Sequence, residues 1–266
     1  MCYDIAYMTQ KAQRYAERYG DTDMWERMQK LTPPTYHVNA FDEPDIPVIT
    51  NEEPGIVRSL HWPFYPNAYT PRNPRTNIPY TTGNARDDKI FKSRMYGDAA
   101  KNRRCLVMID GFFDHHKIPG DPQKVVYPHY VYLKDHEPFL IAGLWQTFEH
   151  KQDDIVRDTV TLVTTRANKE MAWIHNEPAY SAESRMVFVV PKGKEDIWLH
   201  GSVEEAKSII EPLPDDVLQY HSCEPIKPNK RLKREYLGNV PEIQNHRVYE
   251  KLEESKGNMP EQGSLF

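Results

Sequence analysis

Apolar positions in this 266-residue chain come mainly in short runs that alternate with proline and turn residues. Runs of this kind, rich in β-branched and aromatic side chains, are typical of β-strands. Several are apolar almost without interruption, as expected for strands that are buried on both faces. We predict strands at residues 36–38, 47–50, 56–60, 105–109, 129–133, 139–144, 159–165 and 185–190.

Helical periodicity is restricted to a few segments. The longest covers residues 9–30, with Thr9 as its predicted N-cap. Its predicted buried face carries Tyr15, Met24, Trp25 and Met28. Residues 66–83 are rich in proline, asparagine and threonine, which predicts a long surface loop. Further helices are predicted at residues 85–100, 169–173, 195–199 and 203–210.

Together these elements predict an α+β fold with a mainly β core in one domain. The apolar periodicity ends at about residue 222, and no internal repeat precedes it. We therefore divide the chain into a domain at residues 1–222 and a basic C-terminal extension at residues 223–266. Residues 250–264 are polar and are predicted to be a flexible tail.

Composition excludes several protein classes. No run of 18 or more apolar residues is present, and the first residues lack the basic start and apolar core of a signal peptide. We therefore expect a cytoplasmic, nucleoid-associated protein that does not contact membranes. Cys2, Cys105 and Cys223 are too few and too widely spaced for a disulfide framework or a zinc site. No metal ion or other cofactor is predicted.

The charge distribution leaves room for a local basic groove. The net charge is -5, which excludes a surface that is basic throughout. Nine basic residues nevertheless lie between Arg72 and Arg104, where only three aspartates oppose them. On charge alone, this stretch and the later group at residues 227–234 are typical of solvated faces.

Cys2 has the most distinctive chemistry in the chain. A small side chain at position 2 favours removal of Met1, which would leave a cysteine with both a thiol and a free α-amine. The α-amine has a reference pKa of about 7.7–8.0, so part of it is unprotonated near neutral pH. With an aldehyde, the amine forms an imine, and attack by the thiolate then closes a stable five-membered thiazolidine. Cys105 and Cys223 lack a neighbouring amine and reach only a labile thiohemiacetal.

An ordered series of short motifs follows Cys2. The motifs are Asn84-Ala85-Arg86, Arg103-Arg104-Cys105-Leu106-Val107, Asp110-Gly111-Phe112-Phe113-Asp114, Ala142-Gly143-Leu144-Trp145, Thr164-Thr165-Arg166-Ala167-Asn168 and Ile174-His175. Each motif is weak, but their order is specific. Over roughly residues 2–200 the series resembles the SRAP family, the SOS-response-associated-peptidase proteins that crosslink to abasic sites.

This resemblance implies a β-barrel-like, mainly antiparallel core with surrounding helices, and it implies catalytic roles for four residues. Cys2 matches the crosslinking residue, and Asn84 matches an asparagine that orients the sugar or the cysteine amine. Asp114 takes the place of a catalytic glutamate. His175 matches a histidine that assists opening of the deoxyribose ring and proton transfer, which suits its imidazole.

The resemblance also implies a groove for single-stranded DNA that leads to Cys2. Such grooves combine phosphate-binding cations with aromatic stacking platforms, and residues 58–104 supply both. Arg86 matches a phosphate-binding arginine, and Arg185 matches the first residue of an Arg-Met pair in the family. The predicted DNA-binding residues are Arg86, Arg185, Trp62, Arg75 and Arg104.

Two of the departures from the family's pattern bear directly on the reaction. Tyr3-Asp4 follows Cys2 where the family has Gly-Arg, so a cation near the phosphate path is replaced by an anion. Asp114 is one methylene shorter than glutamate, which places its carboxylate about 1.5 Å further from the same target. The efficiency of the reaction therefore depends on how the backbone positions Asp114.

The end of the chain suggests a second partner. Gln262-Gly263-Ser264-Leu265-Phe266 resembles the short peptides by which bacterial replication proteins dock on the sliding clamp. In such peptides a glutamine and a terminal Leu-Phe pair enter an apolar pocket. Gln262, Leu265 and Phe266 are therefore predicted clamp-binding residues.

Three functional hypotheses follow from the sequence. The first is a protein that crosslinks Cys2 to abasic sites in single-stranded DNA, with associated lyase and self-cleaving peptidase activity. The second is a hydrolase with a cysteine nucleophile, in which Asp114 and His175 assist Cys2. The third is a single-strand binder without catalysis. The first requires that Met1 is removed.

Overall fold

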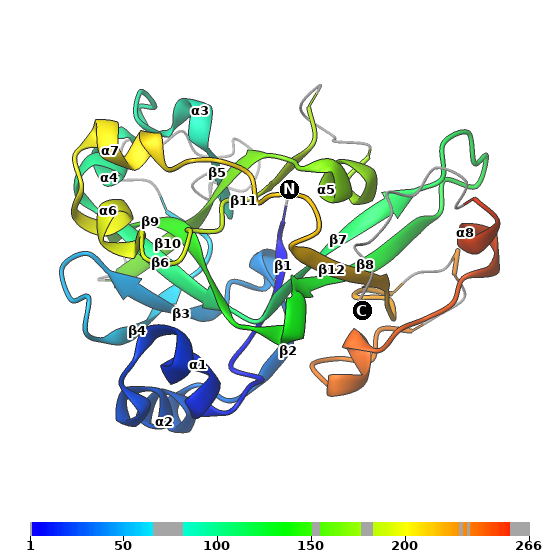
Figure 1. Cartoon of the computed structure of the whole chain (residues 1–266), viewed down its shortest axis with the longest axis horizontal. Coiled ribbons are helices and arrows are strands. Elements are labelled where there is room, and N and C mark those ends of the chain that lie inside the picture. The colour runs from blue at the N-terminus through cyan, green and yellow to red at the C-terminus, as the bar shows by residue number, and fades with distance from the viewer. Residues whose placement is uncertain are drawn as a thin grey trace.

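Two β-sheets with short helices around them make up the protein in the computed structural model (Figure 1). The described residues are 2–65, 82–150, 155–176, 183–228, 231–232 and 235–255. Because apolar side chains from both sheets and from the helices enter one main core, the predicted single α+β domain is confirmed.

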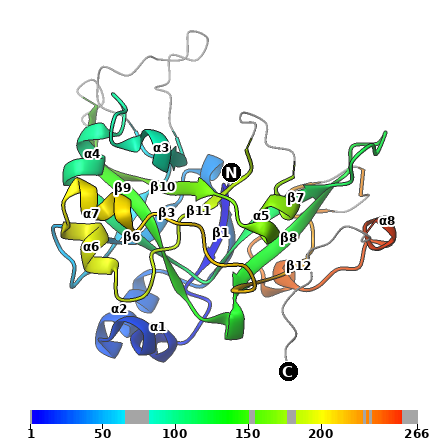
Figure 2. The ribbon, with the colours of Figure 1, turned by 45° about the horizontal axis from the view of Figure 1, so that its top comes forward.

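The first sheet is antiparallel throughout, and the N-terminal strand lies inside it. Figure 2 shows β1 in the middle of the molecule, between the β7–β8 hairpin and the strands of the second sheet. The strand order is β12 (Leu218–Ser222), β8 (Val126–Leu133), β7 (Gly111–Lys117), β1 (Asp4–Tyr7) and β2 (Thr35–Asn39).

The second sheet carries most of the apolar strands. Its order is β11 (Arg185–Val187), β10 (Ile155–Arg166), β4 (Val57–His61), β3 (Asp45–Thr50), β6 (Arg104–Ile109) and β9 (Phe139–His150), and β5 (Asn84–Arg86) pairs with β10. Because β9 also pairs with β10, the pairings from β10 through β4, β3, β6 and β9 close into a ring. The predicted barrel-like core is therefore an appropriate description. The term is loose, because β10 meets β4 at a single parallel pair of residues.

The helices are short and lie outside the sheets. They are α1 (Ala12–Tyr19), α2 (Thr22–Leu31), α3 (Asp87–Ile90), α4 (Gly97–Asn102), α5 (Lys169–Ile174), α6 (Glu195–His200), α7 (Val203–Ser208) and α8 (Glu250–Glu254). Three turns of 3-10 helix accompany them, at Ala40–Asp42, Lys134–His136 and Pro241–Gln244. No helix in the described ranges is long and apolar enough to cross a membrane.

The predicted strands and the three short helices at residues 169–210 are confirmed, with ends shifted by a few residues. The long helix predicted at residues 9–30 is two helices. Gly20 has a φ of 73° and Asp21 a φ of 57°, and the Asp21 side chain caps α2 by accepting from Met24 N at 2.9 Å. Residues 85–100 are also divided, into β5, α3 and α4, because β10 supplies a strand partner for β5.

Thr9 is not a helix N-cap, because a buried carboxylate takes its hydrogen bonds. Its backbone N–H and Oγ1 donate to Asp110 at 2.7 and 2.8 Å, and Lys11 is the N-cap of α1. The hydroxyl of Tyr15 also donates to Asp110, at 2.8 Å. Burial raises the pKa of Asp110 to about 6, and the hydrogen bonds from Thr9 and Tyr15 oppose that shift. Asp110 thus joins α1 to the turn between β6 and β7.

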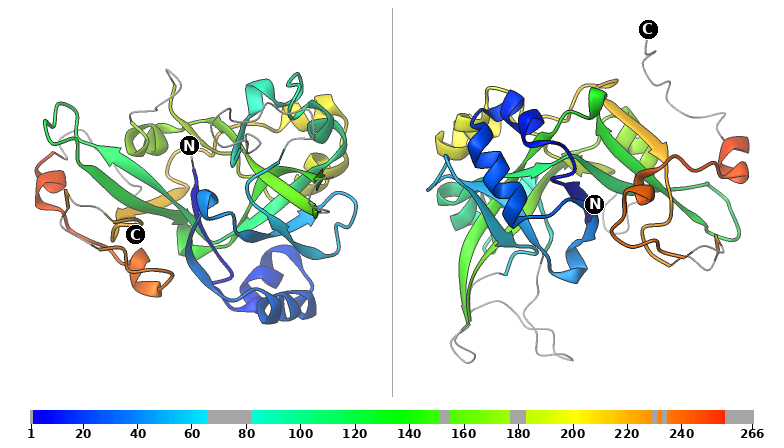
Figure 3. Two further views of the ribbon diagram at one scale, coloured as in Figure 1. Left: turned by 180° about the vertical axis from the view of Figure 1, so that it is seen from behind. Right: turned by 90° about the horizontal axis from the view of Figure 1, so that it is seen from below.

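The C-terminal extension packs beside the first sheet, apart from α1 and α2, where Figure 3 draws it in orange and red. Cys223 forms a β-bridge with His246, and its carbonyl accepts from Tyr249 OH at 2.8 Å. Asn239 Oδ1 accepts from the backbone N–H of Tyr36 and His37 on β2, at 2.6 and 3.2 Å. The extension therefore reaches the strand next to β1.

Gly111 begins β7 where no larger side chain fits. A Cβ at this position would lie 2.4 Å from the hydroxyl oxygen of Tyr130, which is buried on β8. Gly143 is similarly confined, since a Cβ there would lie 2.8 Å from Cys105 Sγ. Both glycines belong to the motifs of the sequence, and both are needed for close packing of strands.

We expect Gly111→Ala to destabilise the protein by about 1–3 kcal/mol, because Tyr130 is held in the core and cannot move away from the new methyl group. Urea or thermal unfolding measures the effect. Gly55→Ala is the matched control, since a Cβ at Gly55 meets nothing within 4 Å. Equal stability of the two variants would contradict the packing role of Gly111.

Candidate functional site

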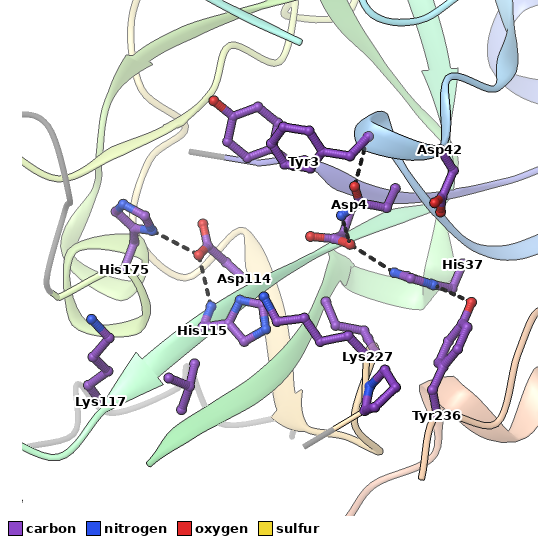
Figure 4. A pocket seen from close by; sticks show the side chains of 15 residues that line it. Tyr3, Asp4, His37, Asp42, Asp114, His115, Lys117, His175, Lys227 and Tyr236 are labelled. Atoms are coloured by element: carbon purple, nitrogen blue, oxygen red, sulfur yellow. Dashed lines mark hydrogen bonds and ion pairs between the residues drawn. The ribbon is translucent and has the colours of Figure 1, made fainter. Parts of the chain in front are cut away.

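The first residues of β1 border a cavity of about 610 Å³ (Figure 4). Its walls come from β1, from β2 and the following 3-10 turn, from β7, from the end of α5 and from the C-terminal extension. Polar and charged lining residues include Asp4, His37, Asp114, His175 and Lys227. The cavity therefore gathers titratable side chains from segments far apart in the sequence.

Asp114 and His175 form a hydrogen-bonded pair on one wall. His175 Nδ1 donates to Asp114 Oδ1 at 2.8 Å, and the same oxygen accepts from His115 N at 2.8 Å. Asp114 is 5% exposed, in the β7 strand that runs beside β1. The structure thus brings together two of the four predicted catalytic residues.

Local sequence explains how His175 is placed. Asn168 caps α5 by accepting from Met171 N at 3.0 Å, and His175 ends the helix with its own N–H on Met171 O. The next residue, Asn176, holds this end of α5 to β7, because its side chain exchanges two hydrogen bonds with the Lys117 backbone at 3.1 and 2.7 Å. The sequence analysis missed Asn176, although an amide side chain next to a predicted catalytic histidine is a usable signal.

Cys2 and Asn84 lie together next to this pair. Asn84 Nδ2 donates to the backbone carbonyl of Cys2 at 2.8 Å, and Cys2 Sγ donates to Asp4 O at 3.4 Å. Cys2 is 2% exposed and Asn84 is 8% exposed. Asn84 Oδ1 is buried and receives no hydrogen bond within the described residues. Such an acceptor is rare and marks a place for a donor.

Electrostatics link Cys2 with Asp114. Burial raises the pKa of the Cys2 thiol far above its usual range, and the charges of Asp114 and Asp4 raise it further. Burial alone would raise the pKa of Asp114 as well. The hydrogen bond from His175 and the positive charge of the chain's amino terminus outweigh that effect and lower the pKa of Asp114 to about 2. Asp114 is therefore ionised near neutral pH.

A second polar chain lines the opposite wall. Asp4 Oδ1 contacts His37 Nε2 at 2.9 Å and accepts from Asn39 Nδ2 at 2.6 Å. His37 Nδ1 lies 2.9 Å from the hydroxyl of Tyr236 in the C-terminal extension. The sequence analysis noted the charge of Asp4 but missed its partners. Their signal in the sequence is weak. The one feature of His37 is its place in the alternating burial pattern of β2, and only the structure shows that pattern.

Two predicted DNA-binding arginines occupy contrasting positions. Arg86 is partly exposed on β5, two residues beyond Asn84, and its guanidinium pairs with Asp88 at 3.0 and 2.8 Å. Arg185 is 3% exposed on β11 and forms an ion pair with Asp87. Arg86 is therefore the arginine of this pair that reaches solvent.

Trp62 and Arg104 do not have the surface positions that the sequence analysis expected. Trp62 is fully buried, and its Nε1 donates to Gly83 O at 2.9 Å. Arg104 is 3% exposed and donates to three backbone carbonyls, including Ala100 O at 3.0 Å. Both predictions of DNA contact are corrected, because these side chains stabilise the interior. Aromatic and cationic residue types alone did not distinguish the two environments.

Other predicted sites lie outside the described residues. Arg75 is in the undescribed segment 66–81, and the predicted clamp-binding residues Gln262, Leu265 and Phe266 are in the undescribed segment 256–266. Within the ranges that the structure describes, no group of three or more His, Cys, Asp or Glu side chains could hold a metal ion.

The arrangement suits proton transfer at the amino terminus. A carboxylate that stays ionised holds an imidazole by a hydrogen bond, which is how acid/base pairs orient the ring and stabilise its charged form. An amide side chain fixes the first residues of the chain, and the charges of two carboxylates act on a buried thiol. These groups can exchange protons with an amine, a thiol and a sugar hydroxyl.

Known proteins are similar to this chain to different extents. The model of the family described as SOS response associated peptidase (SRAP) matches residues 1–226. The chain is 27% identical over 144 residues to Abasic site processing protein YMR114C of Saccharomyces cerevisiae, covering 52% of this chain and 35% of that protein. It is 22% identical over 237 residues to Abasic site processing protein HMCES of Xenopus tropicalis, covering 80% of this chain and 66% of that protein. The chain thus spans between about a third and two thirds of these relatives.

Two solved structures have the same fold. A protein from Bacteroides thetaiotaomicron superposes with a TM-score of 0.73 at 27% identity, covering 93% of this chain and 100% of that chain. A protein from Bordetella bronchiseptica superposes with a TM-score of 0.62 at 19% identity, covering 84% of this chain and 100% of that chain. The fold of this chain is therefore also the fold of these two proteins.

The lowered pKa of Asp114 predicts a dependence of stability on acid pH. The unfolded chain binds the proton of this carboxyl near its ordinary value of 3.8, and the folded chain only near 2. Unfolding therefore takes up a proton in this window, so stability falls by about 2–3 kcal/mol as the pH drops from about 4 to about 2. Asp114→Asn should lose this component, and urea unfolding of both proteins across the window measures it. Parallel curves would contradict the ion pairing of Asp114.

Proposed function

Because the chain belongs to the SRAP family, we propose that it processes abasic sites in single-stranded DNA by forming a covalent thiazolidine through Cys2. The names of the two relatives describe abasic site processing, and the cavity beside Cys2 has the groups that this chemistry requires. The observation that carries the proposal is the buried, unoccupied acceptor Asn84 Oδ1 next to the start of the chain.

After removal of Met1, both polar atoms of the Asn84 amide would have a partner in Cys2. Nδ2 already holds the carbonyl of Cys2 at 2.8 Å, and Oδ1 is a buried acceptor without a donor among the described residues. A free α-amine on Cys2 supplies such a donor. Asn84 would then hold the carbonyl and the amine of the same residue, and this would fix the direction in which the amine attacks.

Asp114 and His175 supply the proton transfers of the first steps. An abasic sugar is mostly a closed hemiacetal, so an acid/base group must expose the aldehyde. The charge of Asp114 attracts an ammonium group at the amino terminus, and His175, held by Asp114, can accept its proton. The neutral amine then adds to the aldehyde, and His175 returns a proton to the departing hydroxyl as water.

The state of the thiol argues against a hydrolase with a cysteine nucleophile. Such enzymes depend on a lowered thiol pKa that keeps the thiolate populated. At Cys2 burial and two neighbouring carboxylates act in the opposite direction. An aminothiol needs no resting thiolate, because the amine reacts first and the thiol is required only after the imine has formed.

Arg86 is our candidate for a phosphate contact beside the cavity. It lies on the same short strand as Asn84, and its present partner Asp88 is on the surface. Exposed ion pairs of this kind contribute about 0–1 kcal/mol, so exchange of Asp88 for a DNA phosphate has little cost.

Wild-type protein should give a band that survives heating on a denaturing gel after incubation with a single-stranded oligonucleotide that contains an abasic site. Cys2→Ala should give none, because it removes the thiol that closes the ring. A form whose N-terminal tag cannot be removed should also give none, since Cys2 then has no free amine. A stable band from the tagged form would contradict the aminothiol mechanism.

Asp114→Asn and His175→Gln should each slow formation of this band by about 10²-fold or more, since each removes part of a general acid/base pair. The rate is measured by quenching samples over time with excess oligonucleotide. His200→Gln is the control, because His200 pairs with Asp196 on the surface away from the cavity. Unchanged rates in both site variants would show that Asp114 and His175 do not take part in the reaction.

A further inference from the structure

The wall opposite Asp114 and His175 holds a second carboxylate–imidazole pair, Asp4 and His37 (Figure 4). An ionised carboxylate only accepts hydrogen bonds, so Nε2 of His37 carries the proton that is donated to Asp4. The other ring nitrogen then accepts from the hydroxyl of Tyr236, at 2.9 Å. His37 is 4% exposed and Tyr236 is 37% exposed. A hydrogen-bonded path therefore connects the surface with Asp4.

Asp4 has one oxygen left for the cavity. Oδ1 receives the bonds from both His37 and Asn39. Figure 4 shows the other oxygen directed into the cavity on the side of Asp114, and no hydrogen bond reaches it within the described part of the chain. This oxygen is available as a proton acceptor.

The thiol of Cys2 needs such an acceptor. Its Sγ donates to the backbone carbonyl of Asp4 at 3.4 Å, so the thiol lies against the residue that carries this carboxylate. The charge of Asp4 acts on the thiol, as does the charge of Asp114. Together with burial, these charges keep the thiol protonated until a base removes the proton at the moment of ring closure.

Asp114 already interacts with the amino terminus, which is the other reacting group of Cys2. It accepts from His175 and from His115 N, and the positive charge of the amino terminus acts on it. Formation of a thiazolidine moves protons at two atoms of Cys2, the nitrogen and the sulfur. The cavity holds a carboxylate–imidazole pair on each of two opposite walls, one for each of these proton transfers.

We propose that Asp4, supported by His37 and Tyr236, is the base that takes the thiol proton of Cys2 during ring closure. Asp114 and His175 serve the amine and the sugar hydroxyl. Asp4 is then a catalytic residue, whereas His37 and Tyr236 are positioning residues that hold its carboxylate in place. The inference rests on the proposed function, since it concerns the second half of that reaction.

The step balances without any further reactant. The S–H bond of Cys2 breaks, its proton passes to Asp4, and Sγ forms a bond to the imine carbon. The π electrons of the C=N bond become a lone pair on nitrogen, which takes a proton from His175. Asp4 releases its proton to solvent in the cavity, and His175 regains one from solvent. The net change is the transfer of one proton from sulfur to nitrogen.

Asp4→Asn and His37→Gln test this assignment. The glutamine side chain can still donate a hydrogen bond to Asp4, but it lacks the rigid ring that bridges Asp4 and Tyr236. Each variant is incubated with the abasic oligonucleotide, quenched with borohydride over time and alkylated after unfolding. Intact mass then separates the products, because a reduced imine leaves all three cysteines open to alkylation and a thiazolidine leaves two.

We expect both variants to form the imine at the wild-type rate and to convert it to thiazolidine about ten-fold more slowly or worse. Asp45→Asn is the matched control, because it breaks an Asp–His pair with His61 outside the cavity at 3.3 Å and should convert normally. Normal conversion in either test variant overturns the inference, as does parallel loss of imine and thiazolidine. If wild-type protein gives no covalent product, the proposed function itself fails.

Discussion

The pairing of β1 on both of its sides is the constraint on which the site depends. The start of a chain usually frays unless hydrogen bonds hold it. Here Asp4 lies opposite Asn39 on β2 and opposite Phe113 on β7, so the residues just before it have a fixed place. The same two strands supply His37 and Asp114 to the cavity. Cys2 is thereby held where the charges of both Asp4 and Asp114 act on its thiol.

Burial strengthens the electrostatic interactions of the charged groups around Cys2. The carboxylates of Asp4 and Asp114 face the same small volume from opposite walls, where charges interact more strongly than in water. Each is balanced by a hydrogen bond from a histidine, and Asp114 also by the charge of the amino terminus. Such a site keeps the thiol of Cys2 protonated, because burial and both carboxylates raise its pKa.

The sequence predicted the second sheet better than the first. Strands such as β6 and β9 are apolar almost throughout, so burial on both faces is visible in the residues themselves. β7 was missed because polar residues interrupt its apolar positions, and β1 because four residues are too short for a pattern. The glycines that seat β7 against β8 and β9 against β6 are explained only by packing.

The candidate site was predictable only in part, for a similar reason. Asn84, Asp114 and His175 came from the resemblance, and the structure brings them together with Cys2. His37 and Tyr236 are 199 positions apart, and no spacing in the sequence connects them. Trp62 and Arg104 have residue types that suit DNA, but burial assigns them to the interior. Contacts between segments that are distant in the sequence determine both the His37–Tyr236 pair and the burial of Trp62 and Arg104.

Mass spectrometry of the N-terminal peptide, after reaction with an abasic oligonucleotide and digestion of the DNA, tests the central claim most directly. We predict a peptide that begins at Cys2, lacks Met1, carries the sugar remnant and resists alkylation at its thiol. A remnant attached to Cys105, Cys223 or a lysine would contradict the account. So would a crosslinked peptide that still begins with Met1.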